Sequence, residues 1–179
     1  MPRPDLTRFY PLTAAVLTVS DSRTQQNDSS GALLCDALQA AGHSIASRAL
    51  LPNNKYLLRA QLSHWIASDE VQVVLINGGT GYAAGNCTID AMTPLLDSTV
   101  PGFGELFRQL SYQDIGSAAL QSGALAGLAN GTLIFAMPGS SSACQLALQH
   151  LILPQLSGKT GPCNFVAHVK HSPSQTCGA

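Results

Sequence analysis

The tetrapeptide at positions 78–81 (GGTG) has the composition of a loop that binds a small anion. It follows the run 71–76, in which five of six residues are apolar; such a run is typical of a strand buried on both faces of a parallel sheet, and a helix is expected to begin near Thr88. Glycines let the backbone approach a ligand closely, and a helix N-terminus favours negative charge. The motif matches neither the P-loop nor the G-x-G-x-x-G fingerprint, so a simple tight turn is an equal alternative for this segment alone.

Small or polar residues also follow two other apolar segments. Ser20 and Asp21 come directly after the expected strand 13–19, and the segment 137–142 (MPGSSS) follows the expected strand 132–136. The carboxyl ends of parallel strands open on one edge of a sheet, which is where ligands bind in open α/β folds. We therefore expect the three segments to meet at one ligand site.

Two acidic residues are candidates for that site, and each has a structural alternative. Asp21 either forms an Asx turn or presents its carboxylate to the ligand, and the sequence leaves these equal. Glu105 is one of only two glutamates and lies where a turn enters a helix. It either complements the helix dipole, which the sequence favours, or accepts two hydrogen bonds from the 2-amino-4-oxopyrimidine edge that pterins and guanine share.

Other chemistries find less support in the sequence. One serine of the run 140–142 would suffice as a helix N-cap, so three in a row suggest extra donors for a phosphate. There is no G-x-S-x-G elbow for a nucleophilic serine. The five histidines lack H-x-H or H-E-x-x-H spacing, and the five cysteines never form C-x-x-C, which argues against a metal site and a disulfide framework. Cys35 and Cys144 are expected to be small core residues.

Hydrophobic periodicity predicts an α/β chain with a mostly parallel sheet. Asn130-Gly131 is typical of a type I′ hairpin, so one strand must run antiparallel. The expected strands are 13–19, 44–51, 71–77, 124–128 and 132–137. The expected helices are 31–41, 55–68, 88–97, 103–111, 113–121 and 141–157, the last with a late break or kink at Pro154.

The composition of the 179 residues predicts one domain. A net charge of −1 without a basic stripe argues against nucleic acid or an anionic membrane as a partner. The sequence shows neither a signal peptide nor a membrane-spanning apolar run, so a soluble cytoplasmic protein is expected. Only 11% of residues are charged, against about 25% in ordinary soluble domains, and burial of weakly polar surface between subunits would account for this. We expect a homo-oligomer.

Five segments together resemble one family. In their order and spacing, these segments are similar to motifs of the molybdenum cofactor biosynthesis B family: LTVSDSR, LINGGTG, PGFGELFRQLS, LIFAMPGS and PCNF. That family shares its molybdopterin-binding fold with the molybdopterin adenylyltransferases. The resemblance covers residues 13–170, flanked by an N-terminal arm (1–12) and a flexible tail (171–179). It implies a three-layer α/β/α sandwich that forms trimers or hexamers and binds a phosphorylated pterin. Carried over by position, the implied ligand-binding residues are Ser20, Asp21, Gly78, Gly79, Thr80, Gly81, Glu105, Gly139 and Ser140.

Two positions differ from the pattern of the adenylyltransferases. Asn53 and Asn86 occupy positions where that pattern has aspartates, and Asp90 is the only acid retained in the run after GGTG, which makes it the one weak candidate for a catalytic residue. Adenylyl transfer from MgATP needs anionic oxygens to hold Mg²⁺, and amides replace them poorly. We expect ligand binding without adenylyl transfer, or with very slow transfer.

Three functions are consistent with these residues. The first is a protein of the molybdopterin pathway that binds a pterin or nucleotide. The second is a non-catalytic oligomer that scaffolds other proteins of the molybdenum cofactor pathway. The third is a GTP-binding protein, because guanine presents the same edge as a pterin. No tightly bound cofactor is expected; molybdopterin, GTP and MgATP are the candidate ligands.

Overall fold

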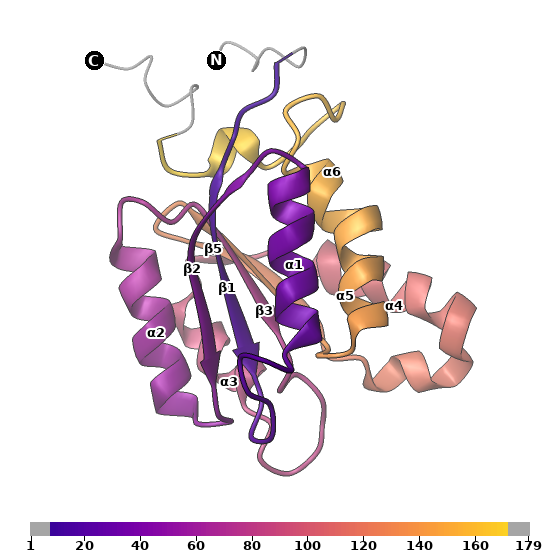
Figure 1. Cartoon of the computed structure of the whole chain (residues 1–179). Coiled ribbons are helices and arrows are strands. Elements are labelled where there is room, and N and C mark those ends of the chain that lie inside the picture. Colours follow the sequence, from indigo (N-terminus) through magenta and orange to yellow (C-terminus); the bar gives the residue numbers. More distant parts are fainter. Residues whose placement is uncertain (1–7, 172–179) are drawn as a thin grey trace.

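The apolar runs of the sequence form one six-stranded sheet in the order β2-β1-β3-β6-β5-β4 (Figure 1). The computed structural model describes residues 8–171. The strands are β1 (Thr13–Val19), β2 (Ser44–Leu51), β3 (Val73–Asn77), β4 (Ser98–Thr99), β5 (Leu125–Ala129) and β6 (Thr132–Met137). Strands β2, β1, β3 and β6 are parallel, whereas β5 is antiparallel to both β6 and β4.

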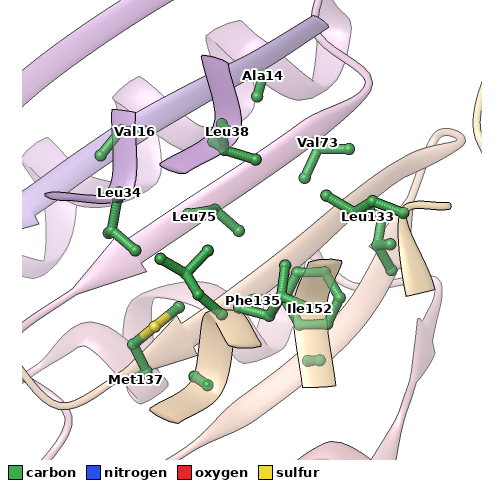
Figure 2. Close-up of a cluster of buried hydrophobic side chains, with 14 of the residues drawn as sticks. Ala14, Val16, Leu34, Leu38, Val73, Leu75, Leu133, Phe135, Met137 and Ile152 are labelled. Atoms are coloured by element: carbon green, nitrogen blue, oxygen red, sulfur yellow. The ribbon is translucent and has the colours of Figure 1, made fainter. Parts of the chain in front are cut away.

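Helices cover both faces of this sheet and complete a three-layer α/β/α sandwich. One face carries α1 (Ser29–Ala40), α4 (Pro101–Ile115), α5 (Ser141–Ala147) and α6 (Leu153–Gln155), and the other carries α2 (Lys55–Ala67) and α3 (Thr88–Met92). Val16, Leu75 and Phe135 pack towards the first group (Figure 2), and Leu17 and Ile76 towards the second. Both faces of the central strands are therefore buried, which explains why these strands read as continuous apolar runs.

The strand predictions are largely confirmed. Strands β1, β2 and β6 have the expected bounds, β5 is displaced by one residue from 124–128, and β3 begins at Val73, two residues later than expected. Asn130 and Gly131 have φ values of 47° and 68°, which fits the predicted type I′ turn. The two-residue strand β4 was not expected from the sequence, because two residues carry no detectable periodicity.

Four helix predictions are wrong in extent. Helix α3 ends at Met92 instead of 97, and Thr93–Leu95 form a 3₁₀ turn that contains a proline. The two helices expected at 103–111 and 113–121 are a single helix α4, which ends where Gly116 adopts a φ of 57° and a 3₁₀ segment begins. In the last helix a π-helical turn at Leu148–Ile152 precedes the short α6 that contains Pro154.

The predicted domain limits, 13–170, stay a prediction, because most of the two flanking segments lies outside the described residues. Residues 9–12 of the predicted arm pack against the domain: Leu12 is buried and its N–H donates to His43 Nδ1 at 3.1 Å. Most of the predicted flexible tail, residues 172–179, lies beyond the described part of the chain.

Lys170 holds the end of the described chain against the edge of the sheet opposite the strand carboxyl ends. Its Nζ donates to the carbonyl oxygens of Ile66 and Ser68 at the end of α2. Its backbone N–H donates to the carbonyl of Gly131 at 2.8 Å, in the turn that precedes β6. Burial lowers the pKa of the Lys170 ammonium group. These bonds place residue 170 beside the amino end of β6.

Candidate functional site

The carboxyl ends of β1, β3 and β6 meet at Gly78. The N–H of Gly78 donates to the carbonyl of Met137 at 3.0 Å, and its φ is 94°. A Cβ atom at Gly78 would collide with the carbonyl oxygen of Val19, and a Cβ atom at Gly139 would lie 3.0 Å from the Gly78 Cα. The predicted convergence of the three strand ends is therefore confirmed, and it requires glycine at position 78.

The GGTG loop is anchored by the start of α3, and the N–H groups of its last three residues are unpaired among the described residues. Thr88, the first residue of α3, donates its hydroxyl to the carbonyl of Gly78 at 2.7 Å and its N–H to the carbonyl of Gly79 at 3.0 Å. Within residues 8–171, the N–H groups of Gly79, Thr80 and Gly81 have no hydrogen-bond acceptor. Consecutive unpaired N–H groups with residues at positive φ form a concave site suited to an anion.

This loop forms one wall of a pocket with a volume of about 370 Å³. The opposite walls come from α3, from Arg108 of α4 and from the segment 123–125. A Cβ atom at Gly123 would collide with the carbonyl oxygen of Thr80, so this segment packs directly against the loop. The volume lies in the range of small-molecule sites.

The structure brings part of the predicted site into this pocket. Gly79, Thr80, Gly81 and the catalytic candidate Asp90 line it, together with Asn86. Six predicted residues do not line it: Ser20, Asp21, Gly78, Glu105, Gly139 and Ser140. Gly78 and Gly139 shape the loops behind the pocket, as described above. The ligand-binding roles assigned to these residues stay predictions.

Asp21 joins two loops instead of forming a local turn. Its Oδ1 accepts from the N–H of Asn53 at 2.8 Å, and its Oδ2 accepts from Asn53 Nδ2 at 2.9 Å. These two hydrogen bonds lower the pKa of the Asp21 carboxyl, the side-chain bond having the larger effect. They also fix the orientation of the Asn53 amide, because a flipped amide would turn its oxygen towards the carboxylate.

The amide oxygen of Asn53 is buried, and no described group donates a hydrogen bond to it. It lies beneath the GGTG loop, since a Cβ atom at Gly79 would be 2.5 Å from it and 2.5 Å from Thr88 Oγ1. A buried acceptor without a donor is costly, so this oxygen is a place where a water molecule or a ligand N–H would stabilise the loop.

The remaining predicted side chains have local partners or face solvent. Ser20 Oγ accepts from the N–H groups of Ser22 and Arg23, which stabilises the turn after β1. Ser140 is the N-cap of α5, because its Oγ accepts from the N–H of Ala143 at 3.2 Å. Ser140 also lines a second pocket, of about 310 Å³, against α4. The side chain of Glu105 is exposed on α4.

A buried hydrogen-bond network supports the same edge of the sheet. Asp28 accepts from Arg48 Nη2 at 2.9 Å, from the Thr18 hydroxyl at 2.7 Å and from the N–H of Gly31 at 2.9 Å. Asn77 Nδ2 donates to Thr18 Oγ1 at 2.9 Å. Burial of the carboxyl would raise the pKa of Asp28, but the bonds from Arg48, Gly31 and Thr18 outweigh it and lower the pKa. The network thus fastens the start of α1 to β1 and β2.

Comparison with known proteins defines the family. The chain matches the model of a probable molybdopterin binding domain over residues 15–158. It is 53% identical over 164 residues to molybdenum cofactor biosynthesis protein B of Escherichia coli (strain K12), with 92% of this chain and 96% of that protein covered. The chain belongs to the molybdenum cofactor biosynthesis protein B family. It is 44% identical over 155 residues to the protein of that name from Bacillus subtilis (strain 168), with 86% and 88% covered.

Solved structures of the family have the same fold. A crystal structure of molybdenum cofactor biosynthesis protein B matches with a TM-score of 0.80 at 42% identity, covering 82% of this chain and 92% of that one. The tungsten cofactor synthesizing protein MoaB of Pyrococcus furiosus matches with a TM-score of 0.72 at 31% identity, covering 78% and 89%. A MogA structure matches with a TM-score of 0.69 at 22% identity, covering 80% and 99%, and shows the fold alone. The predicted fold class is therefore confirmed.

This member of the molybdenum cofactor biosynthesis protein B family shows no fitting set of ligands for Mg²⁺ among its described residues. Among residues 8–171 no group of three or more His, Cys, Asp and Glu side chains could hold a metal ion. Asn53 and Asn86 supply neutral amides, and both oxygens of the Asp21 carboxylate are bound by Asn53. Mg²⁺ prefers anionic oxygens in octahedral geometry. The donor set therefore does not suit the metal that adenylyl transfer requires.

Sequence reasoning missed Arg108 as a pocket residue. The spacing places Arg108 on the same helix face as Gly104, four residues earlier, but it does not indicate that this face borders the pocket. It also missed the extent of the Asp28 network, since the sequence indicated only an N-cap. Arg48 lies in a neighbouring strand, and no local pattern predicts that pair.

Proposed function

We propose that this protein binds a phosphorylated pterin in the pocket formed by the GGTG loop, α3 and α4. The observation that carries the proposal is the row of three unpaired N–H groups at Gly79–Gly81 in a pocket that also contains Arg108. An anionic group on the ligand would satisfy both the N–H groups and the guanidinium. Membership of the molybdenum cofactor biosynthesis protein B family supports a pterin as the rest of the ligand.

GTP is the second candidate ligand. Guanine and pterin share the 2-amino-4-oxopyrimidine edge, which donates two hydrogen bonds to a carboxylate. The pocket contains one carboxylate, Asp90, and therefore offers an acceptor to either ring. MgATP lacks this edge and needs a metal site, so it is the weakest of the three candidates.

Adenylyl transfer is proposed to be absent or very slow. Asn53 and Asn86 remove two negative charges from the presumed metal position, and Asp21 is already occupied by Asn53. Each lost metal-binding carboxylate corresponds to several kcal/mol of transition-state stabilisation, and about 1.36 kcal/mol changes a rate tenfold. The protein's place in the pathway would then be to bind and hand over its ligand, or to scaffold other pathway proteins.

We further propose that the protein acts in the cytoplasm as a homo-oligomer, a trimer or a hexamer. The 11% share of charged residues supports this, together with large apolar side chains exposed on and after α4: Leu106, Tyr112, Ile115 and Leu120. No helix in the described part of the chain is long and apolar enough to cross a membrane. Sedimentation of the purified protein tests the assembly, and a stable monomer at low micromolar concentration would contradict it.

Isothermal titration of the purified protein with molybdopterin, GTP and MgATP tests the ligand. Tightest binding of molybdopterin supports the proposal, binding of GTP alone supports the second candidate, and no binding supports a scaffold. Gly79→Ala is not a clean probe of the GGTG loop. A Cβ atom there would lie 2.5 Å from both Asn53 Oδ1 and Thr88 Oγ1. Gly81→Ala, whose Cβ would lie 3.3 Å from Asn86 Nδ2, alters the pocket with less strain.

Pyrophosphate release from MgATP with molybdopterin tests the transfer step. The wild-type protein should release pyrophosphate very slowly or not at all, and Asn53→Asp with Asn86→Asp should raise the rate at least tenfold if two anionic oxygens are what the site lacks. Robust turnover by the wild-type protein would show that other residues hold the metal.

A further inference from the structure

Only two of the side chains that line the pocket are charged, and they have opposite signs. Asp90 belongs to α3 and Arg108 to α4, which cover opposite faces of the sheet. We propose that these two residues set the orientation of the ligand: Arg108 binds its phosphate, and Asp90 binds the 2-amino-4-oxopyrimidine edge of its ring. This inference rests on the proposed function of the pocket and adds the residues that determine specificity.

The guanidinium of Arg108 lies against the backbone of Gly104. Arg108 lies one helical turn after Gly104, and a Cβ atom at Gly104 would be 3.0 and 3.1 Å from Arg108 Nη1 and Nη2. The side chain therefore folds back along α4 towards the helix N-terminus, as long helical side chains do.

The guanidinium lies beside the first turn of α4, and no described anion pairs with it. The N-terminus of α4 carries a partial positive charge, and the guanidinium has neither an ion pair nor a hydrogen bond within residues 8–171. A phosphate would compensate both charges, and the planar guanidinium can donate two parallel hydrogen bonds to it. The N–H groups of Gly79–Gly81 line the same pocket and would supply further donors.

Asp90 is the acidic residue in position to bind the ring edge. Its backbone carbonyl accepts from Arg59 Nη2 at 3.0 Å, but its carboxylate has no partner among the described residues. Glu105, the residue to which the sequence assigned this role, lies on the exposed surface of α4 and does not line the pocket. The structure thus transfers the recognition of the ring from Glu105 to Asp90.

The surface between the two charges suits a flat ring. Ile89, Ala124 and Leu125 contribute apolar walls, and glycines 81 and 123 add no side chains. A planar bicyclic ring can stack in such a space with its donor edge at Asp90 and its phosphorylated substituent at Arg108. Apolar walls with a few polar groups at defined positions are the usual design of small-molecule sites.

Three synthetic probes separate the two contacts. 6-Hydroxymethylpterin phosphate carries both recognition groups, 6-hydroxymethylpterin lacks the phosphate, and 6-hydroxymethyllumazine phosphate carries an oxygen in place of the 2-amino group. Dissociation constants of the full-length protein are measured by isothermal titration. Arg108→Ala should weaken binding of the pterin phosphate by roughly 10- to 100-fold and leave the unphosphorylated pterin unchanged. Arg108→Lys should give an intermediate loss, because it keeps the charge without the fork.

Asp90→Asn should remove the preference for pterin phosphate over lumazine phosphate, which we expect to be at least tenfold in the wild-type protein. Glu105→Gln tests the alternative carboxylate, and Lys159→Ala is the matched control for loss of an exposed positive charge away from the pocket. Thermal unfolding of each variant verifies that it is folded.

The outcomes distinguish the inference from the proposed function. If the wild-type protein binds none of the probes, the proposed function and the inference both fail. If it binds the pterin phosphate but Arg108→Ala has no effect, or Glu105→Gln rather than Asp90→Asn removes the preference, the orientation is wrong while the function stands.

Discussion

Two pairs of an aspartate and an arginine lie at the same edge of the sheet, but only one pair is satisfied within the protein. Arg48 and Asp28 form a 2.9 Å ion pair in which the carboxylate side chain is 1% exposed. Asp90 and Arg108 line one pocket without pairing with each other or with another described group. The first pair is satisfied within the protein and therefore contributes to folding, whereas the second leaves its charges available to a ligand. The two pairs contain the same residue types, so their different roles follow from whether each charged side chain has a partner within the protein.

Each pair also lies beside a glycine of a helix. A Cβ atom at Gly31 would collide with Asp28 Oδ2, so this glycine lets the carboxylate lie against the helix backbone. A Cβ atom at Gly104 would crowd the guanidinium of Arg108, but its tightest contact would be the carbonyl oxygen of Ala124 at 2.7 Å. Glycine normally weakens a helix by about 1 kcal/mol relative to alanine, so Gly31 sacrifices helix propensity for the position of a charge.

The largest expected effect is the loss of the buried aspartate. Asp28→Ala should lower the free energy of unfolding by about 2–4 kcal/mol, because it leaves Arg48, Thr18 and the N–H of Gly31 without their acceptor. This loss is smaller than for a fully buried ion pair, because the side chain of Arg48 is 33% exposed. Asp90→Ala should change it by no more than about 0.5 kcal/mol. Urea unfolding of both variants measures the difference. Equal losses would contradict the distinction between the two pairs.

A smaller effect is expected from the glycine that accommodates the Asp28 carboxylate. Gly31→Ala should destabilise the protein by about 1–3 kcal/mol, despite the better helix propensity of alanine, because the new Cβ displaces the Asp28 carboxylate. Gly102→Ala is the matched control, since no atom lies within 4 Å of its Cβ position in α4, and it should stabilise by up to about 1 kcal/mol. Thermal and urea unfolding compare the two. A stabilising Gly31→Ala would show that Asp28 can move freely.

The smallest effect is the pH dependence that the buried pair confers. The pKa of Asp28 is lower in the folded protein than its usual value of 3.8, so its contribution is fully present above that value and is lost as the pH falls through the folded pKa. The unfolding free energy of the wild-type protein should therefore fall on acidification below about pH 4, and Asp28→Asn should fall less steeply. Urea unfolding between pH 7 and 3 measures both slopes. Equal slopes for the wild-type protein and Asp28→Asn would mean that the charge of Asp28 does not stabilise the folded protein.

The strands and the position of the site were predictable because their causes are local. The continuous apolar run of β3, the Asn130-Gly131 turn and the glycines after β3 each act within a few residues, and the meeting of strand ends follows from parallel pairing. Helix ends were harder to predict, because the break at Gly116 depends on a single backbone conformation.

The composition of the pocket was only partly predictable. The ligand site draws on α3 and α4, which come together only through tertiary packing, so neither Arg108 nor the separation of Glu105 from the pocket follows from spacing alone. The same reason applies to the Asp21–Asn53 contact, which joins loops 32 residues apart. Asp21 follows β1 as expected, but its partner lies after β2, and no sequence pattern links the two.

The attachment of Lys170 has a practical consequence for surface-based binding measurements. Its bonds to the end of α2 and to Gly131 hold the C-terminal part of the described chain at the amino end of β6, whereas the pocket opens at the carboxyl ends of the strands. Capture of the protein on a sensor chip through residues next to Lys170 would therefore leave the pocket facing the flowing solution. Capture through residues 8–12 offers the same geometry, because β1 begins at that edge, so both modes of capture should give the same ligand affinity.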